Sequence, residues 1–313
     1  MFGASKQQIG IIAVVAIVGL RMVIGLHFFK EGAEKKLDPK PFSGGFFANA
    51  KGPFAGSFRS LAWDTDGRAR LGYAQTENGP AVDQKPTETQ WNHYKERAAA
   101  HYGFTQKQKS RAGQAVKQRI VQLEQFVLLN EDDIVEYFHS LDRRERNREN
   151  PAYVELPGLQ AHAKRIESES RKKGAPLIAE VDAMWVGLED DIQRIATSAQ
   201  RQLGQLELIR LGRQQMDSVE VDKLIPYFDM AIGMLLIVGL FTRIAAVAGG
   251  AFLASVVASQ WPGSEGAIAT WPQMIEMLAL FALAGLAAGH YFGLDAAIHS
   301  TGRLLTTPRR AAA

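Results

Sequence analysis

The chain contains no cysteine in its 313 residues. This absence excludes disulfides, thiol catalysis and thiolate metal sites within the chain, but it identifies no compartment, because reducing and oxidising compartments both tolerate it. An excess of charge of one sign is also missing, since 36 Lys and Arg face 33 Asp and Glu and the net charge is +3. So small and dispersed a charge argues against a nucleic-acid partner.

Catalytic motifs are missing too. The sequence has no P-loop, dinucleotide-binding glycine fingerprint, zincin helix or nucleophile elbow. Four histidines of the polar part show no metal-ligand spacing among themselves: His93, His101, His139 and His162. We therefore expect no metal site and no self-contained catalytic centre, so that the chain is at most a subunit of an enzyme.

Charge is unevenly distributed along the chain. Residues 30–223 carry 30 Lys and Arg and 29 Asp and Glu, whereas the rest of the chain carries only 6 and 4. A large, nearly neutral polar segment therefore separates a first hydrophobic segment, residues 1–29, from the hydrophobic residues 224–295. Residues 296–313 follow as a polar C-terminal tail.

Four apolar runs are long enough to cross a bilayer as helices. They cover residues 9–29, 224–241, 244–261 and 271–292. A soluble bundle is disfavoured because the runs lack polar faces, and a cleaved signal peptide is disfavoured because no small-x-small cleavage site precedes Arg21. The sequence predicts an all-α membrane protein, a four-transmembrane-helix bundle with a long extramembrane insert.

Positive charges in short segments predict the orientation. On one side of the predicted bundle fall Lys6, Arg243, Arg303, Arg309 and Arg310. This distribution predicts a multi-pass protein of the inner cell membrane with cytoplasmic termini, an extracytoplasmic insert and membrane lipid as its surroundings. Against it stand four lysines directly after the first run: Lys30, Lys35, Lys36 and Lys40.

Four ionisable residues interrupt the apolar runs: Arg21, His27, Asp229 and Glu276. Counting from the ends of the runs places all four in the half of the bilayer that faces the insert. They form either a structural ion pair, between Arg21 and Asp229 or Glu276, or a polar pocket for a lipid-soluble ligand such as a quinone headgroup, or a proton path. His27 could instead reach for the interface. A haem is disfavoured because His27 and His290 fall near opposite membrane faces.

The insert reads as two parts. Residues 30–86 are glycine- and aromatic-rich and irregular, with turn-forming pairs at Asp66-Gly67 and Asn78-Gly79. Residues 87–223 predict a coiled-coil-like helical hairpin, because apolar residues recur in steps of three and four before and after a connector near Pro151. Capping-box patterns begin at Thr87 and Thr105. Asn130 either belongs to the first apolar seam or caps a new helix.

Three short motifs carry a resemblance to a known family. The first, from Arg21 to Leu37, contains Gly25, Gly32 and Lys35; the second, GMLLIVGLFTR, ends in Gly239, Thr242 and Arg243; the third, GHYFGLD, contains Gly293 and Asp295. In order and in spacing to the helix ends, they resemble the DoxX/DoxD-like membrane proteins. The resemblance covers only the terminal parts of the chain, and ordinary members join the first two helices by a far shorter segment.

This family includes the small subunit of thiosulfate:quinone oxidoreductase. The resemblance therefore implies a membrane subunit of a quinone-linked redox system, with a quinone as ligand and no intrinsic cofactor. The insert would then contact a protein partner. The alternative is a non-catalytic scaffold or assembly factor that presents a helical arm to its partner.

Overall fold

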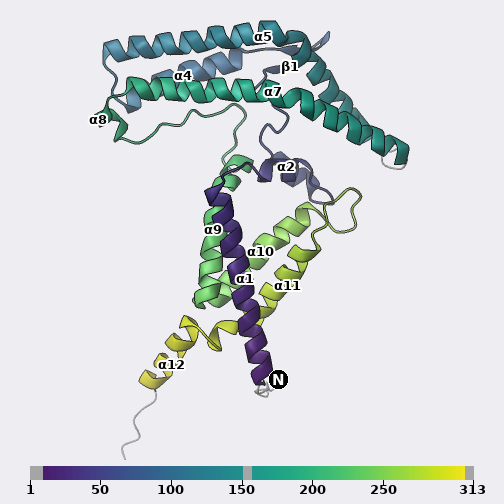
Figure 1. The fold of residues 1–313 in the computed structure, drawn as a ribbon, viewed down its shortest axis with the longest axis vertical. Helices are drawn as coiled ribbons and strands as arrows, with labels where there is room; N and C mark the ends of the chain where they lie inside the picture. Colours follow the sequence, from purple (N-terminus) through teal and green to yellow (C-terminus); the bar gives the residue numbers. More distant parts are fainter. Residues whose placement is uncertain (1–9, 151–156, 307–313) are drawn as a thin grey trace, which may run out of the picture. The chain divides into compact units, whose positions relative to one another are not determined.

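The computed structural model describes residues 10–150 and 157–306. Lys6, Arg309 and Arg310, which contributed to the predicted orientation, and Pro151 of the predicted connector lie outside the described residues. The chain divides into two compact units, which we call the bundle unit, Met1–Trp63 with Gln214–Ala313, and the insert unit, Asp64–Arg213. Helices dominate both units (Figure 1), so the predicted all-α class is confirmed.

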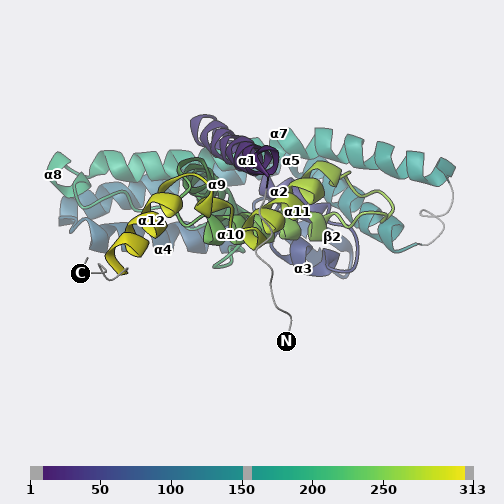
Figure 2. The same ribbon diagram turned by 90° about the horizontal axis from the view of Figure 1, so that it is seen from below.

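The bundle unit contains four main helices and four shorter elements among its described residues. The main helices are α1 (Ile11–Leu37), α9 (Ser218–Val238), α10 (Thr242–Ser259) and α11 (Trp271–Gly285). The shorter elements are α2 (Ser43–Ala48), α3 (Ala55–Ser60), η1 (Ala288–His290) and α12 (Leu294–Thr306). Helix α1 packs along α9, and α10 packs along α11 (Figures 1 and 2).

Two helices of the described chain, α1 and α10, are long and apolar enough to cross a membrane. Helix α9 carries three charged residues, Glu220, Asp222 and Lys223, in its first two turns, and α11 is only 15 residues long. Length and composition therefore support membrane association through α1 and α10.

Glycines set the contact between α1 and α9. A Cβ on Gly233 would lie 2.6 Å from the Gly25 carbonyl oxygen, and one on Gly32 would lie 2.6 Å from the Pro226 carbonyl oxygen. The two helices therefore run antiparallel with their backbones nearly touching, the packing that small residues permit in lipid.

Two helix ends differ from the predicted runs. Helix α1 continues past residue 29 to Leu37, and its last turn places Lys35 and Lys36 where basic residues favour a helix C-terminus. Helix α11 ends at Gly285 instead of continuing to residue 292, because Ala287 adopts a left-handed conformation with φ 51°. The predicted polar tail begins as a helix, α12, up to Thr306, and residues 307–313 lie outside the described chain.

The aromatic-rich residues 38–63 belong to the bundle unit and not to the insert. The amide of Lys51 donates to the Ser259 carbonyl at 2.8 Å, and the amide of Trp261 donates back to the Lys51 carbonyl at 3.1 Å. Gly52, with φ 101°, makes this approach possible, since its Cβ would lie 2.3 Å from that of Trp261. The insert predicted over residues 30–223 is therefore shortened to Asp64–Arg213 as a compact unit.

The insert unit is a helical hairpin with a third helix and a small β-hairpin. Strands β1 (Tyr73–Thr76) and β2 (Gly79–Val82) pair antiparallel, Thr76 opposite Gly79, and precede α4 (Lys85–His101). Helices α5 (Gln106–Glu149) and α7 (Pro157–Ile195) lie side by side (Figure 1), and the short α8 (Ser198–Arg201) follows. The structure thus has the predicted hairpin, although its second long helix ends at Ile195 and not near residue 223.

Large side chains fill the interior of the insert unit. Trp91 of α4 meets Trp185 of α7 edge to face, with ring centroids 5.6 Å apart, and both are fully buried. The Tyr137 hydroxyl donates to the Asp66 carbonyl oxygen at 2.8 Å. Burial and the Asp66 carboxylate raise the pKa of Tyr137 to about 12.

The helix caps predicted in the insert are confirmed only in part. Thr105 forms the predicted capping box with Gln108. Thr87, however, is buried within α4, whose N-cap is Gln84. Asn130 divides α5 into two helical halves: its φ of −123° and ψ of 15° are not helical, and its side-chain amide donates to the Phe126 carbonyl oxygen. A new helical segment therefore begins after the kink at Asn130, in line with the second of the two alternatives.

Candidate functional site

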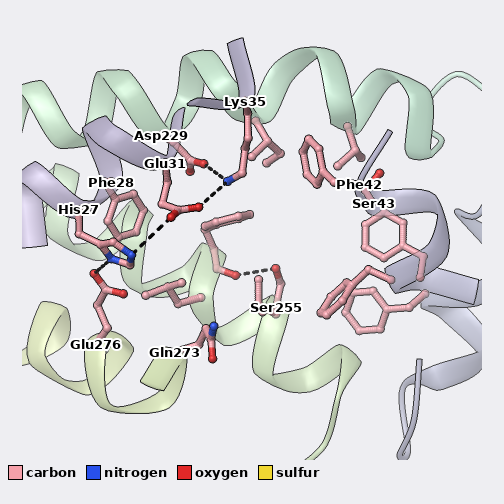
Figure 3. Close-up of a pocket in the computed structure, with 18 residues that line it drawn as sticks. His27, Phe28, Glu31, Lys35, Phe42, Ser43, Asp229, Ser255, Gln273 and Glu276 are labelled. Carbon is pink, nitrogen blue, oxygen red and sulfur yellow. Dashed lines mark hydrogen bonds and ion pairs between the residues drawn. The ribbon is translucent and has the colours of Figure 1, made fainter. Parts of the chain in front are cut away.

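The bundle unit contains a half-open cavity of about 450 Å³ next to the N-terminal half of α9 (Figure 3). Its walls come from α1, α2, α3, α9, α10 and α11. Such a volume is within the range that small-molecule sites occupy.

One face of α1 supplies the charged wall of the cavity. His27, Glu31 and Lys35 follow each other at intervals of four and therefore share this face. His27 Nδ1 lies 2.9 Å from Glu276 Oε1, and Lys35 Nζ donates to Asp229 Oδ2 at 2.8 Å. Glu31 lies between the two pairs, 3.9 Å from each of the two α1 neighbours (Figure 3). The face thus ties α1 to both α9 and α11.

Phenylalanines form the apolar wall. Phe47 and Phe58 stack with ring centroids 6.0 Å apart, and Phe46 packs beside Phe47 at 6.2 Å. The Lys35 ammonium lies 5.4 Å from the centroid of the Phe42 ring. The cavity therefore has charged groups at one end and aromatic rings at the other (Figure 3), which suits an amphiphilic molecule with a planar headgroup.

Arg21 is not part of this cavity, which corrects the predicted cluster. Its Nη1 donates to the carbonyl oxygen of Phe292, and its side chain is fully buried. The reason is the register of α1 on α9, because Gly239 lies next to the Arg21 guanidinium whereas Asp229 lies next to Gly32. Since α1 extends to Leu37, Lys35 takes the place next to Asp229 that the sequence had given to Arg21, about 21 Å along the helix. His27, Asp229 and Glu276 all line the cavity.

Most family-motif residues serve the packing of the bundle. Around Arg21, Gly239 and Gly293 adopt positive φ values of 69° and 115° and lie against each other. The Asp295 carboxylate accepts from the amides of Phe241 and Thr242 and so caps α10.

The remaining motif residues lie in a helix contact, on the surface or in the cavity wall. Gly25 and Gly32 lie in the contact between α1 and α9, and Arg243 is exposed. Lys35 is the one motif residue that lines the cavity.

Sequence reasoning missed several lining residues, chiefly Glu31, Gln273 and the phenylalanines of residues 42–58, which are Phe42, Phe46, Phe47 and Phe58. The spacing of His27, Glu31 and Lys35 on one helix was the signal that could have identified Glu31. The phenylalanines were visible as a composition bias, but their place in the bundle depends on the backbone pairing of Lys51, which no local pattern predicts.

In the part of the chain that the structure describes, no group of three or more His, Asp or Glu side chains is arranged to hold a metal ion. No family model, no curated protein and no solved structure matches the chain.

Proposed function

We propose that the chain is a multi-pass membrane protein of the DoxX/DoxD type that binds a quinone in the cavity of its bundle unit, as the membrane subunit of a redox system. The motifs quoted above and the apolar helices α1 and α10 support this family and this setting. Helices α9 and α11, which pack on them, complete a four-helix bundle in the bilayer.

The observation that carries the proposal is the division of the cavity into a charged and an aromatic end. A quinone ring can stack on Phe47 and Phe58, while its ring oxygens reach His27 and Lys35. Its isoprenoid tail would continue along the apolar side chains of the bundle. Ionisable groups within a membrane commonly mark such functional sites.

Binding tests the proposal directly. The full chain in lipid nanodiscs should bind a short-chain ubiquinone analogue, and Phe47→Ala together with Phe58→Ala should weaken binding by about tenfold or more, since each stacked aromatic contributes about 0.5–1.5 kcal/mol beyond its area. Arg21→Met should leave binding unchanged, because Arg21 does not line the cavity. Equal binding by wild type and the phenylalanine variants would contradict the site.

The proposed topology places both termini in the cytoplasm and the insert unit outside, because short positively charged segments stay inside. Reporter fusions after Lys107 and at Ala313 should then report opposite sides of the membrane. If both report the same side, the four-span arrangement is wrong.

A second function, that of a scaffold or assembly factor, is favoured by one surface of the insert unit. Leu128 and Leu129 on α5 are 76% and 82% exposed, directly before the kink at Asn130. Such adjacent exposed leucines suit contact with a protein partner. Leu128→Glu with Leu129→Glu should abolish co-purification of a protein partner without changing quinone binding. The phenylalanine variants should weaken quinone binding without changing co-purification. If the protein is a scaffold without a quinone site, only the loss of partner co-purification in the leucine variant should be seen.

A further inference from the structure

Helix α12 is attached to the end of the bundle where α9 passes into α10. The Asp295 carboxylate of α12 accepts from the amides of Phe241 and Thr242, each at 2.9 Å. One turn later, the His299 ring stacks on the His290 ring of η1, with ring centroids 4.8 Å apart and planes 17° apart. Because Asp295 and His299 are four residues apart, they share one face of the helix. This polar face of α12 therefore lies against the bundle.

The apolar face of α12 points away from the bundle. Leu294 and Ile298, also four residues apart, are 46% and 62% exposed, and Ala297 beside them is exposed as well. A helix on the surface of a water-soluble protein turns its apolar face toward the protein and its polar face toward water. Helix α12 does the opposite, so an apolar medium outside the bundle has to cover Leu294 and Ile298.

The neighbouring surface indicates that this medium is lipid. Phe241, Ile244 and Phe292 are 59%, 68% and 64% exposed at the same end of the bundle. The exposed face of α12 therefore continues the apolar exterior of α10, one of the two helices that are long and apolar enough to cross a membrane. Arg243, between Phe241 and Ile244, is exposed too. A guanidinium at this position suits the phosphate groups that border the apolar layer of a bilayer.

We infer that α12 is an interfacial helix, which lies at the level of the phospholipid headgroups with Leu294 and Ile298 among the upper parts of the acyl chains. The inference rests on the membrane setting of the proposed function and is independent of the quinone. Amphipathic helices bind a bilayer surface through the apolar area that they bury and through nearby basic residues. Helix α12 extends away from the four main helices of the bundle unit (Figure 1), so its apolar face can enter lipid.

Single spin labels test this placement in the full chain, which has no cysteine of its own. Ile298→Cys and Ser300→Cys attach a nitroxide to the apolar and to the polar side of α12, both at exposed positions. Leu294→Cys repeats the test on the apolar side. Val247→Cys is the reference, because Val247 is 50% exposed on α10.

Each labelled protein is reconstituted into vesicles of phosphatidylcholine and phosphatidylglycerol. Power saturation then measures how often the label collides with oxygen, which concentrates among acyl chains, and with a water-soluble nickel complex. The ratio of oxygen to nickel collisions should be several-fold higher at positions 294 and 298 than at position 300, and highest at position 247.

The reference position separates this inference from the proposed function. If position 247 collides mainly with oxygen while positions 294 and 298 collide mainly with the nickel complex, α12 lies in water and the inference alone is overturned. Equal ratios at positions 298 and 300 would overturn it as well. Positions 294 and 298 shielded from both reagents would assign the face to a protein partner or a second copy of the chain. Nickel collisions at position 247 would overturn the membrane setting itself.

Discussion

The two units exclude water from their interiors in different ways. In the bundle unit, Gly25 and Gly233 bring two helix backbones into contact, and the helices α10 and α11 meet at Gly249 and Gly250. In the insert unit the interior is filled by large side chains such as Trp91 and Trp185. The first arrangement depends on the absence of side chains, and the second depends on their volume.

The two units also differ in the side chains that they expose on their surfaces. Apolar side chains of the bundle unit are widely exposed, for example Ile12 at 86% and Ile244 at 68%. The insert unit instead carries exposed ion pairs, such as Lys173 with Glu136 at 2.6 Å. Because the two units differ in what fills their interiors and covers their surfaces, we expect substitutions in one unit to leave the other unchanged.

The largest expected effect is on the insert unit. Trp185→Ala removes a fully buried ring that packs on Trp91, so it should lower the free energy of unfolding by about 3–5 kcal/mol. A soluble fragment of residues 64–213 should show this loss in denaturant melts followed by helical circular dichroism. Quinone binding by the full chain should persist, and its loss would contradict the independence of the units.

Alkaline pH should also act on the insert unit. The pKa of Tyr137 is about 12 when folded and near 10.0 when unfolded, so the neutral hydroxyl is favoured in the folded state. Stability is therefore complete below pH 10 and falls as the pH rises from 10 to 12, by about 3 kcal/mol.

Tyr137→Phe, which cannot ionise, is the control for this effect. In the same 64–213 fragment it should lose about 1 kcal/mol at neutral pH, for the hydroxyl's bond to Asp66, but should show a smaller decline above pH 10. An equal alkaline decline in both proteins would assign the effect to other groups.

A smaller loss of stability is expected when a side chain is added between the closely packed helices α1 and α9. Gly233→Ala would place a Cβ 2.5 Å from the Phe29 amide nitrogen, so α1 and α9 must separate, at a cost of about 1–3 kcal/mol. Thermal unfolding in detergent should show the loss. Gly19→Ala is the matched control, because a Cβ there meets nothing within 4 Å. Equal melting temperatures for the two variants would show that the close contact contributes nothing.

Periodicity and hydropathy predicted the helical class, the apolar helices α1 and α10 and the pair of long helices α5 and α7. Each of these depends on a repeating pattern of apolar residues within one segment of the sequence. The partner of Arg21 could not be predicted in this way. Its position depends on where α1 ends and on the register that Gly25 and Gly32 impose, and the sequence run had suggested an end at residue 29 instead of Leu37. The aromatic wall was missed for a similar reason, because the pairing of Lys51 with α10 joins residues far apart in the chain.

Photoaffinity labelling tests the central claim most directly. A ubiquinone analogue with a diazirine on its ring, irradiated with the full chain in native membranes and mapped by peptide mass spectrometry, should label residues 42–58 and the face of α10 around Ser255. An excess of unlabelled quinone should suppress this labelling, and the combined Phe47→Ala and Phe58→Ala variant should reduce it. Labelling confined to the surroundings of Arg21 or to the insert unit, or labelling that excess quinone does not suppress, would contradict the account.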